Sequence, residues 1–242
     1  QVSLGTSGKG NALIAAGGAI NIASVKDEVN TSQKNDPSSK MHDKQVHQNQ
    51  TVVGAGVVAA GDLTVAAGVG GKADLTITAG VLAGGGNVVL SGTNDVKVLS
   101  TTENHLSDTA IHRESSSTFK KSSYTTTDYS AATLVVGSSI SGDNVSIAAG
   151  NDIVIGASQV RAEDALALGA GRDLVLTTAE STSSEHHTHQ EKKSGFSLSA
   201  DGFGYSKGEN KQAGNGNAVT QVGSYLSGGS VSTISGRDTL IK

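Results

Sequence analysis

Histidine is the residue type in this chain best suited to chemistry, and three histidines stand close together. His186, His187 and His189 form the run His-His-Thr-His. Neutral imidazoles bind transition metals, so these three are the candidate metal ligands of the chain. However, no cysteine or carboxylate accompanies them at a familiar ligand spacing, and histidines in a segment rich in Ser and Thr are usually solvated. We therefore expect no metal and no other cofactor.

Carboxylates are the second group of side chains that could do chemistry. Asp or Asn recurs just before short triplets of the form apolar-x-apolar, as at Asp95, Asp152 and Asp173. Paired carboxylates cleave glycosidic bonds. Asp and Asn also tolerate tight turn geometry, which explains the recurrence without catalysis. The Gly-rich run at residues 68–72 lacks the spacing of a phosphate loop and is interpreted as a turn. The sequence predicts no enzyme.

Aromatic side chains are the remaining candidates for binding. Six of the seven Phe and Tyr residues, and all seven histidines, fall in three polar segments at about residues 26–50, 101–131 and 179–218. A net charge of −4 offers no basic field for nucleic acid, so we expect none as a partner. The candidate binding residues are Phe119, Tyr124, Tyr129, Phe196, Phe203 and Tyr205.

Outside the polar segments the chain repeats a short apolar-x-apolar triplet. Within residues 144–176 the triplets begin at Val145, Ile153, Leu166 and Leu174, so the pattern steps by 8, 13 and 8 residues and returns after 21. The outer residues of a triplet share one face of a strand. A third apolar position precedes some triplets by five or six residues and predicts a third strand in each coil: Val58, Leu82, Ile140, Val160 and Leu226.

This repeat predicts a right-handed parallel β-helix with coils of about 21 residues. No helical spacing separates the triplets, and the links are too short for crossover helices, so each strand pairs with its equivalent one period later. An antiparallel sandwich is the alternative, but it would use more aromatic residues and has no reason to return after 21. A core of Val, Ile, Leu and Ala, with 32 Gly and no Trp, suits a narrow column. A polysaccharide-degrading β-helix enzyme is the remote functional alternative.

The three polar segments interrupt the helix as excursions. Alternating apolar and polar residues in the second and third predict hairpins that lie along the helix or project from it. Disorder is the alternative, and for the first segment the two interpretations stay open. Both ends of the chain break off inside the repeat pattern. We therefore expect residues 1–242 to be a single β-helix segment of a longer chain, without a signal peptide or a membrane-spanning run.

Two long stretches carry a family resemblance. Residues 133–180, beginning TLVVGSSISGDNVSIAAGNDIVIG, and residues 222–242, VGSYLSGGSVSTISGRDTLIK, resemble the haemagglutinin repeats of two-partner-secreted exoproteins. This is the family of filamentous haemagglutinin and the contact-dependent growth inhibition toxins. The run Glu-Ser-Thr-Ser-Ser at 180–184, followed by KKSGFSLS and a return at Val222, is similar to the excursion of those repeats.

The resemblance implies a role within a very large exoprotein of a Gram-negative bacterium. Such a protein is secreted or held at the cell surface, where it is associated with the outer membrane, and a dedicated outer-membrane transporter is its partner. It serves in adhesion or in contact-dependent toxin delivery, and any toxin domain lies elsewhere in the parent. We expect this chain to be a structural shaft segment. The alternative is a module that binds a target-cell receptor, a surface glycan or a membrane directly through the excursions.

Overall fold

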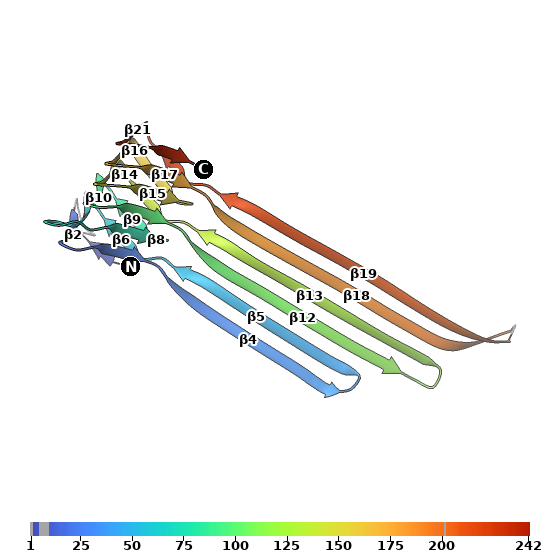
Figure 1. Cartoon of the computed structure of the whole chain (residues 1–242). Helices are drawn as coiled ribbons and strands as arrows, with labels where there is room; N and C mark the ends of the chain where they lie inside the picture. The colour runs from blue at the N-terminus through green and yellow to red at the C-terminus, as the bar shows by residue number, and fades with distance from the viewer. Residues whose placement is uncertain (1, 5–9, 201) are drawn as a thin grey trace.

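A computed structural model describes residues 2–4, 10–200 and 202–242 (Figure 1). These residues form strands and no helix, and they make up three sheets. No helix able to cross a lipid bilayer is found in the described part of the chain. The prediction of an all-β fold is therefore confirmed.

Two of the sheets consist of short parallel strands, and together we call them the parallel stack. The ten-stranded sheet contains β1 (Val2–Leu4), β2 (Ala12–Ala16), β6 (Gly56–Ala59), β7 (Leu63–Ala67), β9 (Val81–Gly84), β10 (Val88–Gly92), β14 (Ser139–Ala149), β16 (Gln159–Ala170), β20 (Tyr225–Ser227) and β21 (Ser230–Ser235). The six-stranded sheet contains β3 (Ile20–Ala23), β8 (Leu75–Thr78), β11 (Val96–Leu99), β15 (Ile153–Gly156), β17 (Leu174–Thr177) and β22 (Thr239–Ile241).

Strands of the stack pair with their equivalents in the next coil. Leu75 pairs with Val96, and Val145 pairs with Leu166, each 21 positions further along. All pairs in these two sheets are parallel, which excludes the antiparallel sandwich for this part of the chain. The arrangement is consistent with the predicted β-helix.

Two details of the predicted repeat are corrected. Val57, not Val58, occupies the third strand position: Val57 is buried and pairs with Leu82. The coil that carries Leu63 to Val88 is also longer than 21 residues. A loop follows β7, where Gly68 and Gly70 adopt φ values of 79° and 91°, a region that side chains disfavour.

The core of the stack is a column of aliphatic side chains. Strands such as β7 and β8 alternate buried and half-buried residues, so every second side chain faces the core. Leu75, Ile77 and Ile155 are fully buried, and the core cluster of the described residues contains Val, Leu, Ile and Ala but no aromatic ring. A column this narrow leaves no room for large rings.

The third sheet is antiparallel and consists of three hairpins; we call it the fin. It contains β4 (Val25–Ser38), β5 (Met41–Val53), β12 (Thr101–Ser116), β13 (Lys120–Val136), β18 (Ala179–Ser199) and β19 (Gly202–Val222). All three hairpins project from one side of the stack (Figure 1). The polar segments are thus hairpins, including the first, for which disorder was an equal alternative.

Neighbouring hairpins pair with each other and make the fin continuous. Strand β5 pairs with β12, and β13 pairs with β18, in antiparallel registers. Polar contacts cross the β5–β12 boundary: Arg113 forms an ion pair with Asp43, and Glu103 accepts a 2.6 Å hydrogen bond from the backbone N–H of Val52. The lateral pairing satisfies backbone groups that a lone hairpin would expose to water.

The spacing of the hairpins along the stack explains this continuity. Hairpins follow β3, β11 and β17, whereas the intervening strands β8 and β15 turn at once into the next strand, at Ala79 and Ala157 with φ values of 45° and 43°. Hairpins therefore leave every second coil. Two coils rise by about 9.6 Å, which is also the width of two paired strands. Each hairpin therefore fills the height available to it.

Candidate functional site: an aspartate row and a histidine-bearing fin

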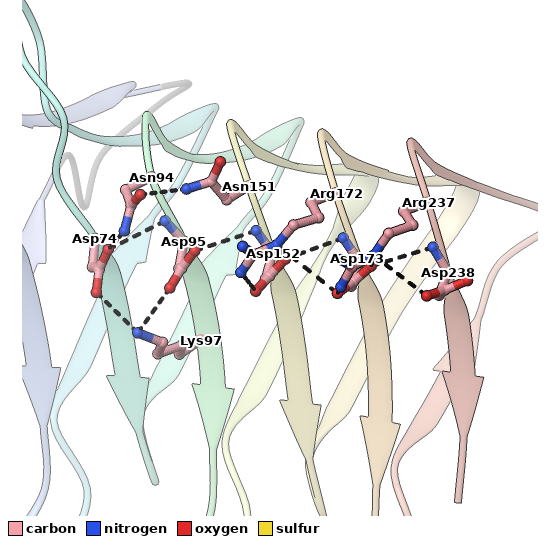
Figure 2. Close-up of polar contacts among 10 residues, drawn as sticks. All are labelled: Asp74, Asn94, Asp95, Lys97, Asn151, Asp152, Arg172, Asp173, Arg237 and Asp238. Atoms are coloured by element: carbon pink, nitrogen blue, oxygen red, sulfur yellow. Dashed lines mark hydrogen bonds and ion pairs between the residues drawn. The ribbon is translucent and has the colours of Figure 1, made fainter.

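The recurrent acids form one row along a corner of the stack. One aspartate stands directly before each strand from β8 to β22 in the six-stranded sheet, and Figure 2 shows the row: Asp74, Asp95, Asp152, Asp173 and Asp238. Oδ1 of each of the first four accepts a hydrogen bond from the backbone N–H of the aspartate in the next coil, at 3.1–3.3 Å. The carboxylates therefore satisfy donors that a turn would leave open.

Basic side chains lie between the carboxylates of the row (Figure 2). Lys97 Nζ lies 2.9 Å from an oxygen of Asp74 and 3.1 Å from one of Asp95. Arg172 donates to both carboxylate oxygens of Asp152, with Nε at 2.7 Å. Arg237 binds Asp173 in the same two-pronged way, which is the favoured geometry of guanidinium with carboxylate.

These contacts favour the charged form of three of the acids. The hydrogen bond from Arg172 lowers the pKa of Asp152, and that from Arg237 lowers the pKa of Asp173. Hydrogen bonds from Asn94 and then Lys97 lower the pKa of Asp74. Glycosidases need one carboxyl with a raised pKa as proton donor, whereas these three shifts run the other way. The row is best explained as a connection between coils.

A column of glycines stands two residues before the last three aspartates of the row. A Cβ on Gly150, Gly171 or Gly236 would lie 2.1, 2.0 or 2.1 Å from a carbonyl oxygen of the coil beneath. These glycines do not have positive φ angles. At these positions glycine is required because two backbones approach closely, not because the turn needs a left-handed conformation.

The three candidate metal ligands lie within four residues of each other on β18. His187 forms an ion pair with Asp128 of β13, and His186 hydrogen-bonds Asn215 of β19. His189 Nδ1 lies 2.9 Å from Thr126 Oγ1. Adjacent residues of a strand face opposite ways, so His186 lies on the other face of the fin from His187 and His189. No group of three or more metal-binding side chains is found among the described residues, and the expectation that these histidines bind no metal stays a prediction.

Most histidines lie at the boundaries between hairpins. The His42 and His112 rings stack across the β5–β12 boundary, with centroids 5.9 Å apart. His47 hydrogen-bonds Ser107 across the same boundary at 3.1 Å, and His105 reaches Asn49 at 2.5 Å. His187 and His189 cross the β13–β18 boundary. The concentration of histidine in the polar segments is thus explained by lateral contacts, which the sequence did not indicate.

The candidate aromatic residues separate into two groups. Tyr124 and Tyr129 lie along β13, where Tyr124 stacks on His189 at 6.4 Å between centroids. The other four lie at the end of the fin farthest from the stack: Phe119, Phe196, Phe203 and Tyr205. Leu198 pairs with Phe203 and completes this second group. Leu198 was not among the predicted binding residues because it is not aromatic. The alternation in Gly-Phe-Ser-Leu-Ser nevertheless places Leu198 on the same face as Phe196.

Comparison with known proteins identifies the repeats. The family model described as hemagglutinin repeat matches residues 37–120 and 116–242. Over 207 residues the chain is 28% identical to tRNA nuclease CdiA-2 of Burkholderia pseudomallei (strain 1026b), covering 85% of this chain and 6% of that protein. A tRNA nuclease CdiA of Burkholderia pseudomallei is 40% identical over 82 residues, 34% of this chain and 6% of that protein.

A third relative is the 16S rRNA endonuclease CdiA of Enterobacter cloacae subsp. cloacae, 29% identical over 125 residues, which are 52% of this chain and 4% of that protein. No solved structure matches the chain. The chain spans a small part, 6% or less, of the curated relatives it matches. It belongs to the hemagglutinin repeat family, as a repeat region of the kind found in contact-dependent growth inhibition (CdiA) and filamentous haemagglutinin-like proteins.

Proposed function

We propose that this chain is a structural shaft segment of a large exported exoprotein. One observation supports the proposal above the others: backbone pairing, the aspartate row and the glycine column all connect each coil to the next. Such a stack lengthens by about 4.8 Å per coil without needing a larger core. Residues 1–242 then act as one right-handed β-helical segment that sets the distance between other parts of the parent.

The parent protein, in this proposal, is secreted or held at the surface of a Gram-negative cell and leaves through a dedicated outer-membrane transporter. It serves in adhesion or in toxin delivery to neighbouring cells. The chemical activity named for the CdiA relatives belongs to those whole proteins, and we assign none to this segment. The lowered pKa values of Asp152 and Asp173 argue against either carboxyl as the proton donor of a polysaccharide-degrading enzyme.

Deleting one structural unit from the parent tests the shaft role. Removal of residues 75–152 joins Asp74 to Ile153, which occupies the position of Leu75 in a later coil. Two coils and the hairpin β12–β13 are lost, whereas the stack stays in register and the remaining hairpins stay two coils apart. We expect normal export and normal contact with target cells, with a shaft shorter by about 10 Å.

The matched control removes one residue more, residues 75–153, so that Val154 follows Asp74. A one-residue slip turns core side chains toward solvent, and export should fail. If the in-register deletion is exported and folded but no longer engages target cells, the segment makes a specific contact and a purely structural role is wrong.

Direct binding through the fin is the second candidate function. It is favoured by the exposed apolar group at the end of the hairpin β18–β19, which is remote from the core of the stack. Replacing residues 183–218 by Asn-Gly closes this hairpin between Thr182 and Val219, which face each other in the ladder. Loss of cell binding by a folded, exported protein would support direct binding, and unchanged binding would exclude it for this hairpin.

A further inference from the structure

The outermost part of the fin carries four large apolar side chains on one face. Phe196 pairs with Tyr205 and Leu198 with Phe203 in the antiparallel ladder, and residues two apart on a strand share a face. The Phe196 and Tyr205 rings lie 5.0 Å apart. The four side chains are 55–85% exposed, with Phe203 at the upper limit. We call Phe196, Leu198, Phe203 and Tyr205 the tip quartet.

The tip quartet stands clear of the rest of the fin. Strand β13 accompanies β18 only as far as Gly195, and the last backbone bond between these hairpins joins Phe196 N–H to the carbonyl of Phe119 at 2.8 Å. Beyond it, β18 has only β19 beside it, and the hairpin extends past its neighbours (Figure 1). Phe119 is itself 64% exposed at this boundary. The apolar surface is therefore a protrusion.

Lysines lie directly behind the quartet on the same face. Lys121 and Lys207 both face Ser194, which is two residues before Phe196. Lys192 lies in the next rung, opposite Glu209. Lys207 forms no ion pair within the described part of the chain, whereas Lys121 binds Glu114 at 2.7 Å. Lys207 follows Tyr205 by two residues, or about 7 Å along the strand.

The end of this face near the tip is net positive, although the whole chain is acidic. Between the quartet and Lys211, four lysines share it with two glutamates, Glu114 and Glu209, whereas the chain as a whole has a net charge of −4. The lysines are Lys121, Lys192, Lys207 and Lys211. Long lysine side chains can bring their charges to the headgroup level while an apolar end enters a bilayer.

We propose that the tip quartet inserts into the surface of a lipid bilayer whose anionic phospholipid headgroups bind the lysines behind it. The inference rests on direct binding through the fin, the second function proposed above, and names its partner. The apolar side chains lie outermost and the charges one to two rungs behind, the order of acyl boundary and headgroups across a membrane surface. A glycan site would need polar groups converging around the rings. Instead, Ser197 faces the opposite side and position 204 is glycine.

Tryptophan fluorescence tests the proposal, because the chain contains no Trp and a single introduced Trp reports one position. Phe203→Trp places the reporter in the quartet. Val219→Trp is the control, since Val219 is 64% exposed on the same strand near the stack. Each 242-residue protein is mixed with phosphatidylcholine vesicles, either neutral or containing roughly one quarter phosphatidylglycerol.

We expect a blue shift for Phe203→Trp with anionic vesicles and none for Val219→Trp. Salt should reduce the shift, because the lysines are exposed. In flotation of the Trp-free chain, Leu198→Ser with Phe203→Ser should weaken vesicle binding by about tenfold or more, since apolar burial drives insertion. The pair Val29→Ser and Val219→Ser should leave binding unchanged. Both pairs are exposed, so the fold is maintained.

Three outcomes would overturn the proposal. The first is no blue shift for Phe203→Trp, and the second is an equal blue shift at both Trp positions. The third is vesicle binding in flotation that does not change when Leu198 and Phe203 are replaced. If the fluorescence of Phe203→Trp instead shifts to the blue without vesicles as the protein concentration is raised, the tip would be assigned to contact between two copies of the chain. Direct binding through the fin fails separately, if the closed hairpin described above leaves cell binding unchanged.

Discussion

Asp152 Oδ1 accepts a hydrogen bond from the backbone N–H of Asp173, one coil further along, at 3.1 Å. Asp173 makes the same contact with Asp238, and Arg172 and Arg237 bind the two carboxylates. The acids that first suggested catalysis are thus used to fix the position of each coil on the next.

Asp152→Ala should lower the free energy of unfolding by about 1–3 kcal/mol, because a backbone donor and Arg172 both lose their acceptor. Urea unfolding followed by circular dichroism measures the change. Asp152→Asn, which keeps an acceptor oxygen, should cost less. Asp238→Ala is the control, since that side chain is 75% exposed and contacts Arg237 only. Equal losses at 152 and 238 would contradict the structural role of the row.

Acid should destabilise the stack through the same residues. The pKa values of Asp74, Asp152 and Asp173 are lower in the folded chain than in the unfolded chain. The unfolded chain therefore binds more protons as the pH falls below about 5, and the stabilisation, complete above that pH, is lost as the folded carboxylates protonate. Melting temperatures between neutral pH and pH 3 test this. The double variant Asp152→Asn and Asp173→Asn should show a shallower acid dependence; an unchanged slope would refute it.

Gly171→Ala should destabilise the chain by about 1–3 kcal/mol, because the new methyl group must displace the carbonyl of Gly150 in the coil beneath. Gly169→Ala provides a control two residues away, where no atom lies within 4 Å of the added Cβ. We expect that control to be neutral in urea unfolding. If the two variants unfold at the same urea concentration, close packing is not the reason for glycine at 171.

Ile155→Ala should cost about 2–5 kcal/mol, because the side chain is fully buried and its removal leaves a cavity in a narrow core. Val154→Ala, the adjacent position on the opposite face of β15, is half-buried and should cost much less. Thermal unfolding of the two variants measures the loss of stability at each position. A larger loss at 154 would mean that the faces of the strand are assigned the wrong way round.

Removing a single coil should damage the fin although the stack stays in register. Deletion of residues 75–95 joins Asp74 to Val96, the pairing partner of Leu75, and brings the first two hairpins one coil apart. Four fin strands must then fit into the height of three coils, and the melting temperature should fall well below that of the two-coil deletion of residues 75–152. Equal stability of the two deletions would show that hairpin spacing is unconstrained.

The parts of the fold that depend on local periodicity could be predicted from the sequence, whereas those that depend on lateral contacts could not. Triplets such as Ile153 to Ile155 alternate clearly, and each is a strand. Val57 and Val58 are both apolar, so the sequence does not show which of them faces the core. The prediction chose Val58, whereas the buried residue is Val57. The close approach of Gly171 to Gly150 joins two coils, and nothing in the sequence next to Gly171 indicates it.

The candidate site was predicted in composition but not in arrangement. The first polar segment has few apolar residues to bury, and it pairs with β12, whose nearest paired residues lie more than fifty positions away in the chain. The histidine run suggested a joint site, but strand alternation puts His186 on a different face from His187 and His189. The tip quartet needed the register of β18 with β19 before Leu198 could be added to the aromatic residues.

The equal height of a hairpin and of two coils has a further consequence. The coils of the stack and the hairpins of the fin both repeat along the same direction. Because two coils are as high as one hairpin, no mismatch between stack and fin accumulates as units are added. Gene duplication can therefore insert whole units without selecting new contacts anywhere else. Since all three hairpins leave from the same side, the stack has one marked side, and position along it can be counted in hairpins.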